Sequence, residues 1–560
     1  MGEKRMKAGT GVAKILKAEG VEWVSCFPVS SIINPCAEEG ITNLMARSER
    51  IAVAIADGYT RVSNGHRHGV CTVMGGLNPA GIENAYAGIA QAYEDSSPIL
   101  CITDGIQTFA TGQTRYDIGK SFDSVAKWVG YINHAYRVPE FMRRAYTFLR
   151  TGSPSPVIVQ LPFDVANEDY DDARFPYRPV KGWKTAGDPR DVEVAVRALL
   201  AAKNPLIYAG QGVFHADACE ELHEFAELVQ VPVLTTLLGK SVFPENHPLS
   251  IGVRGEPVEH FLHKADLVFA IGNCLTRTHF SHHIPNPSGK VIIQLTIDEF
   301  GINNRFAVDH AIVGDARLVL RQLIDEVKRQ AGRKGPRKDE ALLKEIKDHK
   351  ERFLKEYMPY LTSDDVPINP YRVFWDLMHT IDRENSIVTH DAGNTRDQTS
   401  TVYEAIIPHG FVGWGNVSTL GFGLGVALGA KLAYPDKMVV WITGDAGIGM
   451  VLGDLETAVR NDIAITTIHI NNSGFGGYGP GFWGPGHHPS TSAVSPSTVV
   501  DMAKVAEGLG EYSERVENPD EVAPAIKRAM RANLSGRPAY LEVICSQYPV
   551  YPGWVGPGGH

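Results

Sequence analysis

Short apolar runs alternate with amphipathic segments along most of the chain. In the first part, residues 10–18 have the apolar spacing of a helix, and residues 21–27 form an apolar run of strand length. The same alternation returns in residues 190–330 and again from Ile368 onwards. Alternating helices and strands are typical of α/β domains built on parallel sheets. We therefore expect an α/β protein.

Polar segments divide this pattern into three parts. Residues 167–188 are polar and contain proline and glycine, which is typical of a linker. Residues 328–355 are charged throughout and predict a linker and a solvated helix with i,i+4 ion pairs, although a patch for the phosphates of coenzyme A (CoA) is a second interpretation. We therefore predict three doubly wound parallel-sheet domains. Their expected bounds are 1–170, 189–330 and 366–560, with 331–365 as the charged linker.

The most informative stretch begins with the apolar run 438–443, which is too short for a helix and rich in β-branched residues. Gly444-Asp445-Ala446-Gly447 interrupts this run and a helical rhythm follows. A second apolar run, 463–470, then ends at Asn471-Asn472. The carboxyl ends of parallel strands lie side by side and form the ligand crevice of a sheet. We therefore expect Asp445 and Asn472 to meet at such an edge.

The side chains at these two strand ends suggest a chemistry. Asp445 and Asn472 offer hard oxygens, the ligand type that Mg²⁺ prefers. The helix that follows Asp445 adds unpaired N–H groups and a positive dipole, which favour an anion. The pattern therefore predicts a magnesium–diphosphate site. Chance is the alternative, because a chain with 56 glycines can contain such a Gly-Asp pair without any function.

The bulk composition narrows the classes of function. The chain has 560 residues, 43% of them hydrophobic, and its net charge of −10 argues against a general nucleic-acid binder. Its N-terminal residues lack the apolar core of a signal peptide, and residues 420–433 are too short to span a bilayer. The seven cysteines have no paired spacing, as expected of thiols in a reducing compartment. We therefore expect a soluble, cytoplasmic protein without nucleic-acid or membrane partners.

The Gly-Asp-Ala and Asn-Asn spacing closely resembles the cofactor motif of thiamine diphosphate (ThDP) enzymes. The resemblance is to the acetolactate synthase, oxalyl-CoA decarboxylase and 2-hydroxyacyl-CoA lyase type, and it extends over nearly the whole chain. It implies ThDP and Mg²⁺ as cofactors, with a pyrimidine-binding, a central and a diphosphate-binding domain in chain order. It places the metal on Asp445, Asn472 and the main-chain carbonyl of Gly474, and further cofactor contacts on Gly444, Ala446 and Gly447.

A second motif surrounds Glu49. Taken alone, the Arg-Ser-Glu-Arg string before a helical stretch is typical of a solvated turn. However, ERIAVAIADGYTR, residues 49–61, resembles the pyrimidine-binding segment of the same family. The resemblance implies that Glu49 contacts the aminopyrimidine ring, favours its imino tautomer and so activates the cofactor. Glu49 is the predicted catalytic residue. Ser48 stands where the family commonly has histidine.

Two more segments resemble the diphosphate-binding domain of the family. In SIVTHDAGNTRDQTS, Asn394 and Thr395 fall in the turn that contacts the diphosphate. In GWGNVSTLGFGLG, Leu420 takes the place of the large apolar residue that props the cofactor into its bent shape. The carbonyl of Ser418 is expected to accept from the aminopyrimidine amino group. An ordinary core residue is the alternative interpretation of Leu420, and it depends on ignoring the surrounding motif.

The sequence gives only weak evidence on the substrate. Residues 392–395, Ala-Gly-Asn-Thr, resemble oxalyl-CoA decarboxylases and 2-hydroxyacyl-CoA lyases, and the open glycine-rich residues 474–486 and the basic stretch near Lys328 favour that branch. Against it, Thr296 stands where members that bind CoA or FAD usually carry aspartate. We expect an enzyme that makes or breaks a C–C bond next to a carbonyl, with an acyl-CoA preferred to a 2-oxo acid. An acetolactate synthase-like or other 2-oxo acid decarboxylase or carboligase is the alternative, and an inactive cofactor-binding regulatory protein a remote one.

The resemblance also bears on assembly. In this family the glutamate-bearing domain of one subunit faces the diphosphate domain of another, so a homodimer or homotetramer with the site at the subunit interface is expected. His487 and His488, in the glycine-rich stretch after Asn472, are candidate acid–base groups or ordinary loop histidines.

Overall fold

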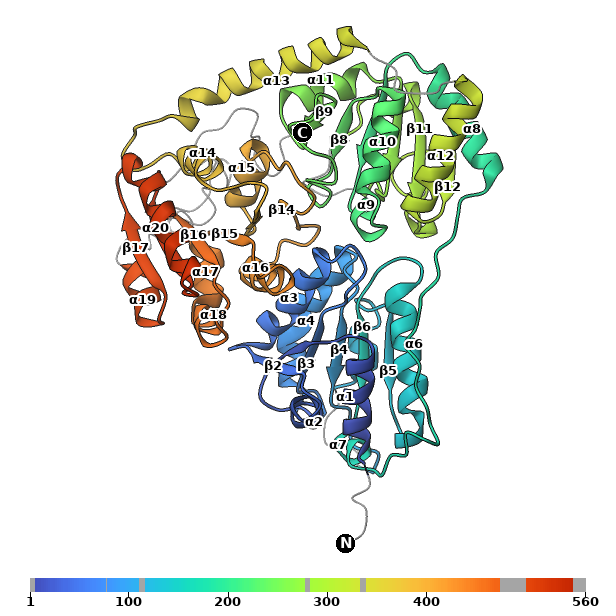
Figure 1. Ribbon diagram of the computed structural model, residues 1–560, viewed down its shortest axis with the longest axis vertical. Coiled ribbons are helices and arrows are strands. Elements are labelled where there is room, and N and C mark those ends of the chain that lie inside the picture. Colours follow the sequence, from blue (N-terminus) through green and yellow to red (C-terminus); the bar gives the residue numbers. More distant parts are fainter. Residues whose placement is uncertain are drawn as a thin grey trace, which may run out of the picture.

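The computed structural model describes residues 6–76, 78–109, 116–276, 283–332, 339–473 and 500–546. Their strands form three six-stranded sheets, and all paired strands are parallel, with helices interleaved between them (Figure 1). This confirms the predicted fold class. The first and third sheets share one strand order, whereas the central sheet has the order typical of nucleotide-binding folds.

The first sheet has the order β2-β1-β3-β4-β6-β5. Its strands are β1 (Trp23–Cys26), β2 (Thr42–Met45), β3 (Val70–Val73), β4 (Leu100–Thr103), β5 (Trp128–Tyr131) and β6 (Val157–Gln160). Its helices are α1 (Ala8–Ala18), α2 (Ile33–Glu38), α3 (Glu49–Arg61), α4 (Ala80–Glu94), α5 (Ile118–Phe122), α6 (Val138–Arg150) and α7 (Phe163–Ala166).

The central sheet has the order β12-β11-β10-β7-β8-β9. Its strands are β7 (Pro205–Ala209), β8 (Val233–Thr235), β9 (Ser250–Gly252), β10 (Leu267–Ile271), β11 (Val291–Thr296) and β12 (His310–Val313). Its helices are α8 (Pro189–Ala201), α9 (Gly212–His215), α10 (Cys219–Val229), α11 (Glu256–Lys264) and α12 (Ala316–Ala331).

A long helix, α13 (Glu340–Leu361), connects the central sheet to the third and lies across the top of both in Figure 1. It begins in the charged stretch that predicted a solvated helix, residues 328–355, and continues six residues beyond it. Lys344–Asp348 and Lys347–Glu351 are i,i+4 ion pairs on its surface. Phe353 and Tyr357 of this helix pack against the third sheet's core instead of facing water. The helix is therefore amphipathic and only partly solvated.

The third sheet has the order β14-β13-β15-β16-β18-β17. β15 coincides with the predicted apolar run, but β16 begins three residues later than predicted because Ile465 N–H bonds to Ile463 in a local turn before the ladder starts. The strands are β13 (Ser386–His390), β14 (Phe411–Val412), β15 (Met438–Gly444), β16 (Thr466–Asn471), β17 (Tyr512–Val516) and β18 (Ala539–Ile544). The helices are α14 (Pro370–Thr380), α15 (Asn394–Val402), α16 (Phe422–Ala433), α17 (Asp445–Val451), α18 (Leu455–Arg460), α19 (Met502–Gly508) and α20 (Val522–Leu534).

Helices α3 and α16 cross in direct contact and join the first sheet to the third. Glycines make the approach close: a Cβ on Gly58 would lie 2.4 Å from Val426 O, and one on Gly425 would lie 2.3 Å from Ala54 Cβ. Apolar side chains of both helices belong to a single hydrophobic core. The two halves of the candidate site are therefore packed against each other within one chain.

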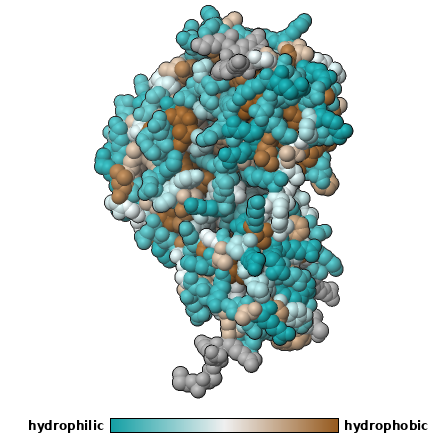
Figure 2. Space-filling view, turned by 45° about the vertical axis from the view of Figure 1, so that its right-hand side comes forward, coloured by the Kyte–Doolittle hydropathy of each residue, from teal (hydrophilic) through white to brown (hydrophobic). Residues whose placement is uncertain are grey.

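The surface seen in Figure 2 is largely hydrophilic, with separate hydrophobic areas. Within the described ranges, none of the helices has both the length and the apolar character needed to cross a membrane.

Candidate active site

The predicted metal ligands lie at the carboxyl edge of the third sheet. β15 pairs with β16 up to Gly444 and Ile470, so Asp445 and Asn472 follow neighbouring strand ends. The main-chain N–H of Asn472 donates a 3.2 Å hydrogen bond to Asp445 Oδ2. The strand order reverses between β13 and β15, and ligands of open α/β sheets bind at such a switch point. The structure thus places Asp445 beside Asn472; their role as metal ligands stays a prediction.

Asp445 is held from the sheet side by a buried histidine. His469 of β16 is 0% exposed, and its Nε2 lies 3.2 Å from Asp445 Oδ1. The hydroxyl of Tyr540 lies 2.7 Å from His469 Nδ1. A carboxylate can only accept, so His469 donates from Nε2 to Asp445. Sequence reasoning missed His469, although a polar ring in a buried strand needs partners of this kind.

An open turn lies beside the strand end that precedes Asp445. Gly393 has φ +88°, and a Cβ placed on it would have no atom within 4 Å. A Cβ on Gly444 would meet the Thr395 methyl at 3.7 Å as its nearest atom. Helix α15 begins at Asn394, and no side chain caps its N-terminus. Uncapped N–H groups at a helix start are donors for an anion, so Asn394 and Thr395 lie where an anionic group fits.

Glu49 is the first residue of α3. The hydroxyl of Ser48 accepts the N–H of Ile51 at 3.3 Å and caps the helix, which explains why α3 begins there. The Glu49 side chain is buried, and its Oε2 accepts a 2.7 Å hydrogen bond from Asn84 Nδ2 of α4. The solvated-turn interpretation of this string is therefore wrong. Asn84 was not found from sequence, because its pairing with Glu49 depends on how two helices pack.

The residues that flank Glu49 reach across to the third sheet. Asp454, in the turn after α17, accepts the Arg47 N–H at 2.8 Å and the Ser48 hydroxyl at 2.9 Å. On the other side, Arg50 donates to the carbonyl of Leu420. These contacts lie within one chain, so the expectation of a site between two subunits stays a prediction. Among the described residues, no hydrogen bond joins the Glu49 and Asp445 side chains.

A buried aspartate positions the segment that carries Ser418 and Leu420. Asp391 Oδ1 accepts the N–H groups of Ala392, at 2.8 Å, and of Gly421, at 2.9 Å. Burial raises the pKa of Asp391 to about 6. The Ser418 hydroxyl accepts a 2.7 Å hydrogen bond from Arg396, and Leu420 packs at the edge of the core shared by α3 and α16. Leu420 therefore has a packing role whatever it contacts in the site.

Comparisons with known proteins show the family of this chain. Three family models match: the thiamine pyrophosphate enzyme N-terminal TPP binding domain over residues 6–126, the central domain over 192–323, and the C-terminal TPP binding domain over 391–543. A probable acetolactate synthase large subunit of Methanocaldococcus jannaschii is 30% identical, with 99% of this chain and 94% of that protein covered. The chain belongs to the thiamine pyrophosphate enzyme family.

Other relatives share the same extent of similarity. A probable acetolactate synthase large subunit of Methanococcus aeolicus is 30% identical over 94% of this chain and 90% of that protein. A glyoxylate carboligase of Escherichia coli O157:H7 is 30% identical over 96% of this chain and 93% of that protein. Thiamine pyrophosphate is another name for ThDP, and this chain is a ThDP-dependent enzyme of the carboligase and decarboxylase group.

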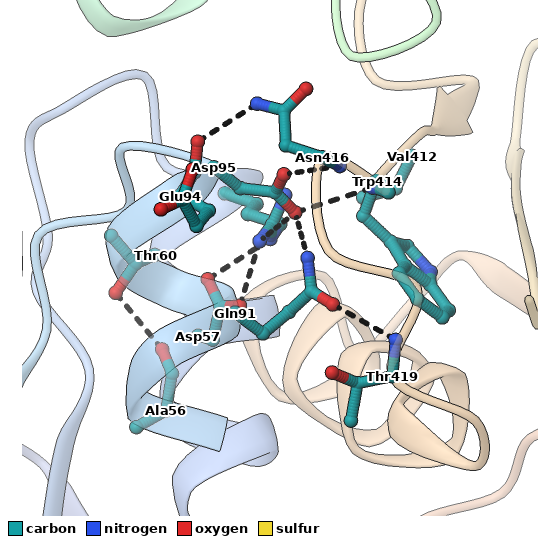
Figure 3. A network of polar contacts seen from close by, with 12 residues as sticks. Ala56, Asp57, Thr60, Gln91, Glu94, Asp95, Val412, Trp414, Asn416 and Thr419 are labelled. Atoms are coloured by element: carbon teal, nitrogen blue, oxygen red, sulfur yellow. Dashed lines mark hydrogen bonds and ion pairs between the residues drawn. The ribbon is translucent and has the colours of Figure 1, made fainter. Parts of the chain in front are cut away.

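In this ThDP enzyme, a buried polar network ties the two cofactor-binding halves together (Figure 3). Asp95, at the end of α4, accepts from Arg61 at 2.9 Å, from Gln91 at 2.6 Å and from the Asn416 N–H at 3.0 Å. Gln91 in turn accepts the N–H of Thr419 at 3.2 Å. Burial raises the pKa of Asp95, and the charge of Arg61 opposes that rise. The network fixes the segment before α16 against the helix that begins with Glu49.

The family models thus show that the chain contains two ThDP-binding domains. The contacts of individual residues with ThDP stay predictions. The open turn at Gly393 and Gly444, with the uncapped start of α15, fits a diphosphate group by shape and by its donors. Three further candidates, Gly474, His487 and His488, lie outside the described residues.

Proposed function

We propose that this chain is a Mg²⁺- and ThDP-dependent carboligase that acts on 2-oxo acids. Asp445 and Asn472 carry the proposal, because they lie side by side at the carboxyl edge of the third sheet, and Asp445 follows β15, which borders the switch point between β13 and β15. The relatives supply the reaction class, since those named above are acetolactate synthases and a glyoxylate carboligase.

The strand ends provide a donor set suited to Mg²⁺. Asp445 contributes a carboxylate and Asn472 a carboxamide oxygen, both hard ligands, and diphosphate oxygens would complete the coordination. His469 and the Asn472 N–H hold the Asp445 carboxylate in place from two sides. Asn394 and Thr395, at the start of α15, would bind the diphosphate together with Gly444, Ala446 and Gly447.

ThDP supplies a carbon nucleophile when bound. The chain's own contribution is Glu49, which would hold a proton at the pyrimidine ring nitrogen and so favour the reactive tautomer. Asn84 orients this carboxylate, and burial keeps water from competing for it. The carbonyl of Ser418 would accept from the ring amino group, and Leu420 would support the bent cofactor.

The relatives support the carboligase alternative over the acyl-CoA preference drawn from Asn394 and Thr395. The central sheet also supports a 2-oxo acid over an acyl-CoA as the substrate. Thr296 ends β11 where a ribose-binding aspartate is usual, and its hydroxyl accepts the Asp298 N–H at 3.0 Å to form a local turn. A 2-oxo acid needs no nucleotide site, so this turn is no obstacle to the proposal.

The substrate is tested with the full-length protein, ThDP and Mg²⁺. We expect pyruvate or glyoxylate, alone or mixed, to yield CO₂ and a 2-hydroxy-3-oxo product detectable by NMR. Oxalyl-CoA and a 2-hydroxyacyl-CoA serve as competing substrates. Turnover of a CoA thioester without any turnover of 2-oxo acids would instead establish the CoA branch.

The cofactor roles are tested with Glu49→Gln and Asp445→Ala. Glu49→Gln should retain ThDP but slow turnover by roughly 10²–10⁴-fold, the scale of an acid–base contribution, and should slow deuterium exchange at the thiazolium carbon. Asp445→Ala should lose the Mg²⁺ dependence of ThDP binding in calorimetry. Asp436→Ala, an exposed aspartate of the same half, is the control and should behave as wild type. Unchanged exchange in Glu49→Gln would remove its assigned role.

A further inference from the structure

The Asn-Asn motif at the end of β16 contains two asparagines, and only the second has a predicted role. Asn472 is the proposed metal ligand, whereas Asn471 is the last residue of the strand. Asn471 is 2% exposed, and its main-chain carbonyl accepts the Cys545 N–H at 2.8 Å within the sheet. Its side chain is therefore buried and needs hydrogen-bond partners inside the protein.

The Asn471 side chain bonds to the turn that follows it. Its Oδ1 accepts the main-chain N–H of Ser473 at 3.0 Å, a bond to the backbone two residues on. Ser473 has φ +53°, which is costly for a residue other than glycine unless its surroundings hold it there. Asn472 lies between these two residues, and its N–H bonds to Asp445 Oδ2 at 3.2 Å. The bond from Ser473 to Asn471 thus holds the turn that carries the predicted metal ligand.

A buried carboxylate holds the other end of the Asn471 amide. Asn471 Nδ2 donates to Glu542 Oε1 of β18 at 2.7 Å, and Glu542 Oε2 accepts the main-chain N–H of Ala503 at 2.9 Å. The Ser473 N–H can only donate, so it faces Asn471 Oδ1 and leaves Nδ2 to the Glu542 carboxylate, which accepts. Glu542 therefore links the end of β16 to the start of α19 and orients the side chain that holds the turn.

Glu542 is 0% exposed, and its contacts are polar. The Arg515 guanidinium lies 3.6 Å from Glu542 Oε1, too far for a hydrogen bond, and its Nε bonds to Glu517. In the part of the chain that the structure describes, the hydrogen bonds to Glu542 come from Asn471 and Ala503. Burying a carboxylate is costly, and an apolar side chain often gives a core as much stability or more. The two bonds therefore indicate that Glu542 positions other groups.

Glu542 lies beside the histidine that supports Asp445. The register of the sheet pairs His469 of β16 with Glu542 of β18. His469 bonds to Asp445 at 3.2 Å, while Glu542 acts on the turn of Asn472 through Asn471. Two adjacent buried polar side chains thus support the two predicted metal ligands, one each.

We propose that Glu542 is a positioning residue for metal binding: through Asn471 it holds the turn that presents Asn472 beside Asp445. This inference rests on the function proposed above, and it gives the first asparagine of the motif a role. Glu542 acts at a distance from the metal, because its link to the turn is the Asn471 amide.

The polarity of this pair can be reversed, which gives the test. In Glu542→Gln the side chain has one oxygen for two N–H donors. The Ala503 N–H is fixed in the backbone whereas the Asn471 amide can turn, so Asn471 should turn its oxygen to the new amide and give up Ser473. Adding Asn471→Asp supplies two oxygens, one for the new amide and one for the Ser473 N–H. The double variant therefore restores every hydrogen bond and the net charge.

Hydrogen exchange tests the turn on the full-length protein without ThDP or Mg²⁺. The amides of residues 472 and 473 should exchange with deuterium faster in Glu542→Gln and return to the wild-type rate in the double variant. This measurement does not depend on the function proposed above.

Metal binding is tested as the Mg²⁺ concentration that half-saturates ThDP binding in calorimetry. Residues that hold metal ligands in place typically contribute 10–100-fold to metal affinity, so Glu542→Gln should raise this concentration by about 10- to 100-fold. Adding Asn471→Asp should bring it back close to the wild-type value. Asn518→Asp with Glu507→Gln makes the same changes at exposed positions of the same half, and this control should behave as wild type.

Two results would overturn the proposal: a half-saturating Mg²⁺ concentration that Glu542→Gln leaves unchanged, or a double variant no better than the single one. If Glu542→Gln does not fold, a double variant that folds and binds Mg²⁺ as wild type does supports the proposal, and one that does not overturns it. Wild-type ThDP binding that is independent of Mg²⁺ would instead contradict the proposed function, and the exchange rates would still decide whether Glu542 holds the turn.

Discussion

Several carboxylates of this chain are buried, and the hydrogen-bond partners of each one influence whether it is ionised or protonated. Asp391 is fully buried but accepts two main-chain N–H groups, and burial raises its pKa to about 6. Glu511, just before β17, is also fully buried, yet neither of its side-chain oxygens has a hydrogen-bond partner. Burial raises the pKa of Glu511 to about 8. Because burial disfavours the charged form, Glu511 is expected to be protonated in the folded protein at neutral pH.

This gives a prediction for stability against pH. The ordinary pKa of 4.5 applies to the unfolded chain, and the folded value is about 8, so the folded state retains a proton that the unfolded state releases between these values. The stabilising contribution is full below about pH 4.5 and is lost as the pH rises to about 8. We expect the Tm of wild type to fall across this window relative to that of Glu511→Gln, which cannot ionise. Scanning fluorimetry between pH 5 and 9 measures the difference.

The matched control is Glu507→Gln, which changes an exposed glutamate near by and should follow the wild-type curve. A Tm difference between wild type and Glu511→Gln that stays constant with pH would show that Glu511 does not titrate in this range.

Individual site residues differ in how far the sequence could identify them. Asp445 and Asn472 follow apolar strands and stand in a spaced motif, so local pattern was enough to expect them at one sheet edge. Glu49 needed the family resemblance, because its neighbours alone are typical of a turn. His469, Asp391 and Asn84 were missed, since each acts through a partner on another element and no local spacing encodes such pairs.

At the scale of elements, the crossing of α3 and α16 decides how close the two halves of the site lie. The helical spacing predicts that each helix has a buried side, but α3 is buried on nearly every face. Gly58, Gly425 and Gly429 allow this, because a Cβ on any of them would meet the backbone or a methyl of the facing helix within 2.5 Å. A sequence reader could note these glycines without knowing which helix they meet.

A methyl group added to a helical glycine should destabilise the fold at the crossing of α3 and α16 but not at an open position elsewhere. In Gly58→Ala the added methyl would lie 2.4 Å from Val426 O, so the helices must separate, at a cost of about 1–3 kcal/mol in the free energy of unfolding. In Gly508→Ala of α19 the methyl meets nothing within 4 Å, and the better helix propensity should leave stability unchanged or raise it by up to about 1 kcal/mol. Urea denaturation of both variants measures the contrast. Equal stability of the two variants would contradict the close crossing.

At the scale of the whole molecule, the fold could be predicted further than the assembly of its parts. The alternation of helices and strands was enough to predict three parallel sheets, because the spacing of apolar residues within each segment indicates whether it is a helix or a strand. The placement of the sheets relative to one another depends on contacts between residues more than 300 positions apart, such as Asp95 with Asn416. Those contacts are set by packing and by buried hydrogen bonds, neither of which leaves a local signal.

Asp95 gives the corresponding prediction for the whole molecule. Asp95→Ala removes the acceptor of Arg61, Gln91 and the Asn416 N–H at once, leaving buried donors and part of a buried charge unpaired. Breaking a buried charged network from one side costs about 3–5 kcal/mol, so the free energy of unfolding should fall by that amount.

The loss of protection from hydrogen exchange should be local. Backbone amides of residues 415–419 should exchange with deuterium faster in Asp95→Ala, while those of β16 and β18, in the same sheet, should keep their protection. Hydrogen-exchange mass spectrometry distinguishes the two regions, with the exposed Asp123→Asn of the first sheet's half as the control. A uniform rise in exchange over the third sheet would mean that Asp95 supports the fold in general, whereas a rise confined to residues 415–419 would show that it holds the segment carrying Ser418 and Leu420 against the helix of Glu49.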